Sequence, residues 1–518
     1  MKDIIISKKK VSIVNLLFNY ANTLFLIVNG LVLLPMYLTH FSINTYGSYL
    51  SSGNIVGMLG LLDAGMSLVL TQKLSTSYAK KDFKSFTQIL GAGLFLSFIL
   101  TVLLVLISLL LLPFIPDWVK AEPNEYKNIQ YAFLLSAIGA GLNISCQNLS
   151  SVFQSWLKVK VSGYANVISA ILGIISTFVG LKLGLGVVSI PLGVFVKGLL
   201  SVIVLAVFLI INLRRDKYPQ IVIKKDYCID LIKSCLPVLG GNVTKSFIDN
   251  SQLLVITNFI NPAASAIFVI TNKVYQVCST LLAPIGSSIY SSISQLVGEG
   301  DSNKIKESII KVFTYFSLFS AIILSTGLAL NSAFISLWVG PENFGGILLS
   351  ILLCINVFVS SRFVFVNFNL FALGIFGKTV LYDQISSVIR VILIFALIRT
   401  IGFIAIPISE LLSITFLSGY FVNKLIVNKL DLNHQEIIKF ISSGLFIFIG
   451  SVFVAIIWQY FFPLAKNWVI LIGQSIAFLS LLSILVFLCS NEARIFFSDL
   501  LLNKIKIFAL TLWKFKRK

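Results

Sequence analysis

The sequence predicts an all-α protein that crosses a membrane many times. The chain has 518 residues, is 57% hydrophobic and has a mean hydropathy of +0.96. Only 12% of its residues are charged, whereas soluble domains carry about 25%. The apolar runs are about 20 residues long, which is the length of a helix that spans a bilayer. Helices are favoured over other spanning structures because lipid leaves unpaired backbone groups unsatisfied.

Windows of this length give about fourteen candidate spans. The first run continues past Pro35 with no small-residue cleavage site, so we interpret it as an uncleaved first span. In chain order the predicted spans are 11–38, 46–71, 89–112, 129–152, 161–180, 187–211, 234–259, 264–290, 309–330, 344–373, 379–398, 401–422, 440–460 and 467–489.

The positions of the basic residues support this count and give an orientation. With the N-terminus placed in the cytoplasm, the cytoplasmic stretches hold 30 of the 40 Lys and Arg residues and the outward loops hold five. Cytoplasmic loops are enriched in Lys and Arg. We therefore expect both termini in the cytoplasm of a bacterial cell, and the protein in its cytoplasmic (inner) membrane.

Two stretches of equal length indicate an internal repeat. Residues 46–82 begin the second span and residues 265–301 begin the eighth. Because they are an even number of spans apart, the halves are expected to be parallel repeats. The predicted organisation is a six-helix lobe in 1–215, a second six-helix lobe in 216–430, helices 13 and 14 in 431–490, and a basic cytoplasmic tail in 491–518.

Charged residues inside the predicted spans are the candidates for chemistry, since each costs about 2.5–3.5 kcal/mol at the bilayer centre on insertion scales. They usually face a bundle interior or a wet cavity. The five cations, predicted to bind an anionic diphosphate or sugar, are Lys197, Lys245, Lys273, Arg362 and Arg390. The four acids, candidates for ion coupling or charge pairing, are Asp63, Asp249, Asp383 and Glu410.

Two interpretations of these charges stay open. Lys245 and Asp249 are four residues apart and can pair on one helix face, which would only fix the packing. Asp383 lies two turns before Arg390 on the same face, near the cytoplasmic end, where it can simply reach water. Alternatively, the cations bind an anionic solute, for which guanidinium groups offer a planar fork, and a carboxylate couples transport to a proton or Na⁺.

Several function classes are disfavoured. The basic residues are spread over loops, which fits membrane orientation rather than nucleic-acid binding. The sequence has no phosphate-binding GxxxxGK[ST] loop, its two His residues fall in loops on opposite sides of the membrane, and its six Cys residues form no CxxC pair. We therefore expect no enzymatic activity, no cofactor and no metal site.

The stretch "LPMYLTHFSINTYGSYLSSGNIVGMLGLLDAGMSLVLTQKLS" and the later "GEGDSNK" resemble bacterial Wzx-type polysaccharide (O-antigen) flippases of the multidrug/oligosaccharidyl-lipid/polysaccharide (MOP) exporter superfamily. The resemblance implies two six-helix lobes that alternate between inward-open and outward-open states. It implies transport of undecaprenyl-diphosphate-linked oligosaccharide repeat units for O-antigen, capsule or exopolysaccharide. It also implies membrane lipids and other polysaccharide assembly proteins as partners.

Two alternatives from the same superfamily stay open. A cation-coupled multidrug exporter would favour twelve spans and a cavity dominated by acids. A lipid II flippase would share the two extra helices, which in that branch form a lateral groove for the lipid tail.

Overall fold

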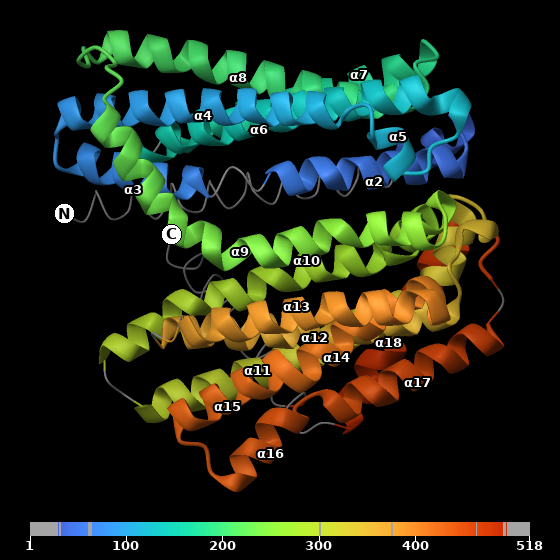
Figure 1. The fold of residues 1–518 in the computed structure, drawn as a ribbon. Coiled ribbons are helices and arrows are strands. Elements are labelled where there is room, and N and C mark those ends of the chain that lie inside the picture. Colours follow the sequence, from blue (N-terminus) through green and yellow to red (C-terminus); the bar gives the residue numbers. More distant parts are fainter. Residues whose placement is uncertain are drawn as a thin grey trace, which may run out of the picture. The chain divides into compact units, whose positions relative to one another are not determined.

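The computed structural model describes residues 30, 33–60, 65–156, 158–299, 302–373, 375, 377–462, 464–489 and 494. Helices make up most of this part and no strand occurs in it (Figure 1). Ten of its helical segments are long and apolar enough to cross a membrane. The prediction of an all-helical, multi-span membrane protein is therefore confirmed, while the count of fourteen stays a prediction. Most of the first predicted span and the basic tail lie outside the described residues.

Backbone contacts divide the chain into two compact units, Met1–Ala266 (unit 1) and Ile267–Lys518 (unit 2). The predicted lobe boundary at residue 215 rests on an internal repeat rather than on compactness, so it stays a prediction.

The helices of unit 1 pack around α6, which contacts α2, α3, α4, α7 and α8. Figure 1 shows α4 and α6 side by side with α8 alongside them. The helices of unit 1 are α2 (Ile43–Leu59), α3 (Met66–Ala79), α4 (Phe83–Leu111), α5 (Ile115–Trp118), α6 (Tyr126–Ser155), α7 (Val159–Lys182), α8 (Ser189–Arg215) and α9 (Lys225–Phe259).

Polar side chains fasten α4 to α6 inside unit 1. Thr101 Oγ1 donates to Gly141 O at 2.9 Å, and Asn148 Nδ2 donates to Ser97 Oγ at 2.8 Å. Lipid tails are as apolar as leucine, so helices in a membrane associate through close packing and such hydrogen bonds rather than through hydrophobic burial.

Glycines allow an equally close approach of α7 and α8. A Cβ atom on Gly193 would lie 2.0 Å from Thr177 Oγ1 and 2.7 Å from Gly173 O. Small residues at helix contacts are the usual means of bringing backbones together in membranes. The two helices therefore need glycine at position 193.

Unit 2 is built around α11, which contacts α12, α16, α17 and α18. The helix α10 (Pro262–Glu299) begins at the end of unit 1 and continues into unit 2. The other helices are α11 (Ser302–Trp338), α12 (Ile347–Ala372), α13 (Gly377–Ile401), α14 (Ala405–Ser413), α15 (Gly419–Leu430), α16 (His434–Ser442), α17 (Leu445–Phe461) and α18 (Trp468–Cys489).

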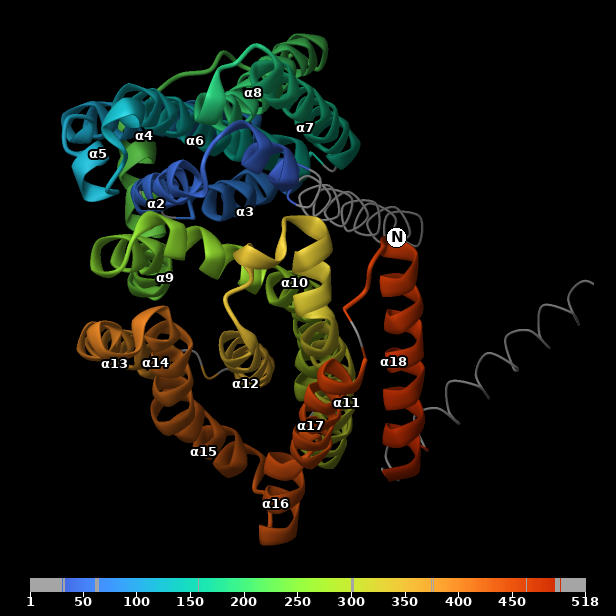
Figure 2. The same cartoon turned by 90° about the vertical axis from the view of Figure 1, so that its right-hand side faces the viewer.

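Two irregular points in unit 2 were not expected from hydropathy. A π-helical turn, η6 (Ile414–Ser418), joins α14 to α15, and such turns occur frequently at functional sites. The short helix α16 precedes α17 and is separated from it by Gly444, whose φ of +69° lies in the left-handed region. Figure 2 shows α16 between α15 and α17.

The sequence explains where α16 begins. Asn433 Oδ1 accepts from the backbone N–H of Glu436, and Glu436 Oε2 accepts from the backbone N–H of Asn433. This reciprocal capping box satisfies two backbone donors that a helix start leaves open. Glu436 also forms an ion pair with Lys306 of α11, so the start of α16 is tied to the centre of unit 2.

Candidate functional site

The predicted charged residues fall on several helices of both units. Asp63 and the side chain of Lys245 lie outside the part of the chain that the structure describes. Asp249 is exposed on α9, and Asp383 is partly buried on α13. The remaining five residues are Lys197 on α8, Lys273 on α10, Arg362 on α12, Arg390 on α13 and Glu410 on α14.

Three polar side chains meet where α12, α13 and α14 come together. Arg390 Nη1 lies 3.4 Å from Glu410 Oε1, and Asn356 Nδ2 donates to Glu410 Oε2 at 2.8 Å. Arg390 is 5% exposed. Glu410 therefore contacts side chains of two other helices, one through an ion pair and one through a hydrogen bond, and the arrangement fixes the packing of the three helices. A buried pair of this kind is costly to break because one charge is then left uncompensated.

The sequence analysis did not identify Glu410 as the partner of Arg390. Glu410 comes from the next helix along the chain. Spacing along one helix gives no information on contacts between helices.

Arg362 has hydrogen-bond partners on three sides. Its Nη1 donates to Ser317 Oγ of α11 at 2.8 Å and to Ser443 O, and its Nη2 donates to Ile441 O at 2.9 Å. The last two acceptors belong to the end of α16 and the link to α17. Helix ends leave backbone carbonyls without partners. Arg362, on α12, provides hydrogen-bond donors for two carbonyls at the end of α16 and also binds Ser317 of α11.

Aromatic rings enclose the same guanidinium group. Arg362 Cζ lies 4.5 Å from the ring centre of Phe313 and 5.4 Å from that of Phe358. Phe313 in turn stacks on Phe440 of α16 with centroids 4.3 Å apart. Cations over ring faces at these distances are attracted by the ring quadrupole. The rings and the hydrogen bonds together hold the charge in one place.

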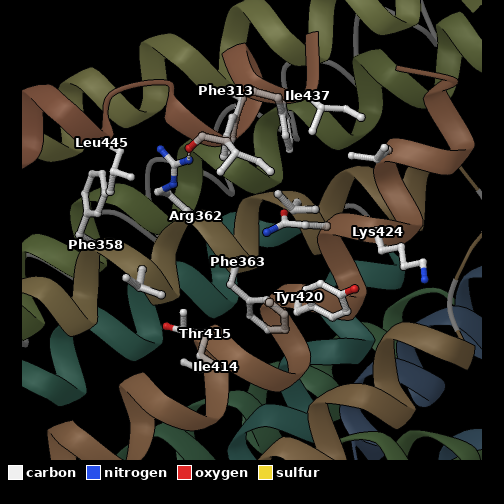
Figure 3. Close-up of a pocket in the computed structure, with 17 residues that line it drawn as sticks. Phe313, Phe358, Arg362, Phe363, Ile414, Thr415, Tyr420, Lys424, Ile437 and Leu445 are labelled. Atoms are coloured by element: carbon white, nitrogen blue, oxygen red, sulfur yellow. Dashed lines mark hydrogen bonds between the residues drawn. The ribbon is translucent and has the colours of Figure 1, made fainter. Parts of the chain in front are cut away.

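A cavity of about 510 Å³ opens beside Arg362 within unit 2. Figure 3 shows Arg362 on one side of it, with Tyr420 and Lys424 of α15 on the other side. The residues that line it are mostly apolar or aromatic: Phe313, Phe358, Val359, Arg362, Phe363, Val366, Ile414, Thr415, Gly419, Tyr420, Asn423, Lys424, Val427, Ile437, Phe440, Ile441 and Leu445.

The chemistry of this cavity is amphiphilic. Hydrophobic and aromatic walls suit a hydrocarbon chain, and the two cations suit an anionic group. The π-helical turn contributes Ile414 and Thr415 to the wall. Sequence reasoning missed Lys424, which was assigned to a cytoplasmic loop because hydropathy ends the predicted span at residue 422. In the structure α15 continues to Leu430 and carries this lysine.

Lys197 and Lys273 are each separate from this cavity. Lys197 lines a second cavity, within unit 1. Lys273 is partly buried on α10, close in sequence to Tyr275, whose hydroxyl lies 2.6 Å from Ser350 Oγ of α12. Within the described part of unit 2, the predicted site residues thus do not form one cluster. Arg390 and Glu410 form an ion pair, and Arg362 lines a cavity elsewhere.

Known proteins share both the sequence pattern and the fold. The family model described as polysaccharide biosynthesis protein matches residues 10–297, which is more than half of the chain. No curated protein matches the chain significantly. The solved structure of the lipid II flippase MurJ in an inward-closed conformation has a TM-score of 0.67 and 13% identity, covering 92% of this chain and 99% of that chain.

Multidrug transporters share the fold as well. An inward-facing multidrug resistance transporter of the MATE family, in the MOP superfamily, has a TM-score of 0.61 and 14% identity over 85% of this chain and 96% of its own. A eukaryotic MATE transporter, AtDTX14, has a TM-score of 0.55 and 12% identity over 88% of this chain and 99% of its own. At these identities the likeness concerns the fold. The expected resemblance to MOP transporters is thus confirmed, and the chain belongs to the polysaccharide biosynthesis protein family.

Proposed function

We propose that this protein is a flippase that moves undecaprenyl-diphosphate-linked oligosaccharide repeat units across the bacterial cytoplasmic membrane by alternating access. The product would feed synthesis of O-antigen, capsule or exopolysaccharide. Membership of the polysaccharide biosynthesis family and the fold shared with MOP transporters support a flippase-type transporter. The family leaves the substrate open, so the substrate is argued from the chemistry of the chain.

The observation that carries the proposal is the cavity of unit 2, which combines a hydrocarbon wall with cations. A lipid-linked oligosaccharide has an apolar chain, an anionic diphosphate and a polar sugar part. Arg362 and Lys424 place positive charge along walls that are otherwise largely apolar. The charge of the partly buried Arg362 acts more strongly than in water, because the effective dielectric constant is lower, whereas Lys424 is exposed.

A further predicted cation adds to this proposal. Lys273 is partly buried inside a helix that is apolar enough to span the membrane, where a charge is costly and usually functional. We propose Lys273 as a contact for the diphosphate at another point of its path, outside this cavity, and the acids Asp63, Asp249 and Asp383 as candidates for coupling to a proton or Na⁺.

The fold shared with multidrug transporters and a lipid II flippase also leaves a cationic drug or lipid II open as cargo, and a transport assay separates these substrates. The purified full chain is reconstituted into liposomes with one of three cargoes: an undecaprenyl-diphosphate-linked oligosaccharide, lipid II or a cationic dye. Arrival at the opposite face is followed with a membrane-impermeant lectin or by dye release. The proposal expects rapid transfer of the lipid-linked oligosaccharide and slow transfer of the other two.

Protein-free liposomes serve as the control, and a Lys273→Gln variant tests the proposed contact with the diphosphate. The variant is expected to slow transfer of the lipid-linked oligosaccharide about tenfold, which corresponds to about 1.4 kcal/mol of lost interaction. Transfer of the dye alone would assign the chain to multidrug export. Transfer of lipid II alone would assign it to peptidoglycan precursors.

A further inference from the structure

The second cavity lies within unit 1, has a volume of about 380 Å³ and contrasts with the cavity of unit 2 in its walls. Four helices, α3, α6, α7 and α8, contribute to it. Each described residue that lines it is polar or a cysteine: Ser67, Thr71, Asn143, Cys146, Gln147, Ser150, Ser151, Gln154, Asn166 and Lys197. Lys197 is the one charged residue among them.

The polar wall is a property of α6. Asn143, Gln147, Ser150 and Gln154 are spaced four, three and four residues apart, so they lie on one face of the helix. The Asn, Gln and Ser side chains of this face can all donate hydrogen bonds. Residues of α3, α7 and α8 form the rest of the cavity wall. Such a polar face is unfavourable in contact with lipid, so it is expected to contact protein, water or a ligand.

Hydrogen bonds within unit 1 hold this wall in position. Ser151 Oγ donates to Ser67 O at 2.9 Å, which joins α6 to α3. Cys146 Sγ donates to Asn166 Oδ1 at 3.2 Å, which joins α6 to α7. Since the carbonyl oxygen of Asn166 accepts from Cys146, its amide group has N–H donors to offer to the cavity.

One hydroxyl of the wall is buried with no partner among the described residues. Ser150 is 7% exposed, lines the cavity, and its Oγ has no hydrogen-bond partner in the described part of the chain. Buried polar atoms are nearly always satisfied by protein, water or ligand. The Cys146 thiol, a water or a ligand would satisfy this hydroxyl.

We propose that this cavity binds a small inorganic anion such as chloride, held by the Lys197 ammonium and by the amide and hydroxyl donors around it. A buried ammonium is stabilised by an opposite charge close by, and no carboxylate occurs among the described residues of the wall. A metal cation would be repelled by the Lys197 ammonium and would favour carboxylate ligands. A drug-sized organic molecule would favour apolar and aromatic walls, and none of the described lining residues is aromatic.

This inference goes beyond the proposed function, because the anion is not the transported substrate and the cavity lies within one unit. The anion would balance the charge of Lys197 and join α3, α6, α7 and α8 through one shared ligand. Chloride should therefore stabilise the protein whatever it transports.

A thermal unfolding experiment on the purified full chain in nanodiscs tests the proposal. Sodium chloride replaces sodium gluconate at constant ionic strength, so that general screening by salt stays the same. The wild type is expected to unfold at a higher temperature as chloride rises, with saturation. Lys197→Gln is expected to raise the apparent chloride dissociation constant at least tenfold, whereas Lys182→Gln, an exposed cation at the end of α7, should leave it unchanged.

Two results would overturn the proposal. One is an equal unfolding temperature of the wild type in chloride and gluconate. The other is an unchanged chloride dissociation constant in Lys197→Gln. If that variant fails to fold, Gln147→Leu retains the charge and removes one donor from the same wall. It should weaken chloride binding severalfold, and wild-type binding in it would likewise contradict the site.

Discussion

Arg362 in unit 2 and Lys197 in unit 1 show two ways of keeping a cation inside a helical membrane protein. Arg362 donates to one hydroxyl and two backbone carbonyls and lies between two phenylalanine rings. Lys197 lines a cavity of neutral polar side chains. The first cation is fixed by the protein itself and organises the packing around it. The second is surrounded by groups that suit a small ligand.

The different surroundings of Arg362 and Lys197 show that a buried charge alone does not identify a transport site. Arg390 supports this conclusion, since it forms an ion pair with Glu410, which also accepts a hydrogen bond from Asn356, and the three residues come from three helices. Substituting Arg362 or Arg390 therefore changes stability as well as any interaction with substrate. Lys273 and Lys424 are better positions at which to separate the two effects.

The largest expected effect is that of Arg362→Ala. Hydrogen bonds from charged groups contribute about 1.5–3 kcal/mol each and are not additive, so we expect the variant to lose about 3–5 kcal/mol of stability. The loss would be seen as a lower unfolding temperature in nanodiscs and reduced protein in membranes. Arg362→Lys keeps the charge but lacks the planar fork, and it should recover less than half of the loss. Full recovery with lysine would show that charge rather than geometry matters here.

The Arg390–Glu410 pair should give a somewhat smaller effect. Glu410→Ala leaves Arg390 buried without this carboxylate, which costs about 3–5 kcal/mol in buried pairs. Since Glu410 is 24% exposed, we expect about 2–3 kcal/mol, measured by thermal unfolding.

The double variant Arg390→Met/Glu410→Leu is the control for that measurement. Replacing both charges with apolar residues of similar size is often neutral or stabilising. The double variant should therefore be more stable than Glu410→Ala. A double variant as unstable as the single one would mean that Arg390 has a further role in holding α13.

A packing change in unit 1 should have a smaller effect still. Gly193→Ala places a methyl group against Thr177 Oγ1 and Gly173 O, and overpacking of this kind costs about 1–3 kcal/mol. Gly53→Ala is the matched control, because a Cβ atom there meets nothing within 4 Å. Equal stability of the two variants would contradict the close approach of α7 and α8.

Much of the fold follows from the sequence because hydropathy and loop charge act over local stretches. The predicted span 440–460 corresponds to α17 at Leu445–Phe461, and the predicted span 344–373 to α12 at Ile347–Ala372. Some helices are longer than their predicted spans. For example, α11 covers Ser302–Trp338 against 309–330, since polar helical turns outside the lipid carry no hydropathy signal.

The candidate site was only partly predictable. Arg362 was identified by its cost in lipid, but its acceptors, Ile441 O and Ser443 O, depend on where α16 ends, and hydropathy does not show that break. The polar face of α6 was visible in principle, because Asn143, Gln147 and Gln154 recur at helical spacing. The signal for this face is the helical periodicity of amide side chains rather than of charged ones.

The most direct test of the account compares two lysines of α15 in the liposome transfer assay. Both lysines are exposed, but Lys424 lines the cavity of unit 2, whereas Lys429 lies in the last turn of the same helix and does not line it. If the cavity binds the diphosphate of a lipid-linked oligosaccharide, Lys424→Gln should slow its transfer about tenfold, or about 1.4 kcal/mol, with Lys429→Gln close to the wild type. Equal transfer rates in the two variants, at equal amounts of folded protein, would contradict a cationic lipid site in this cavity.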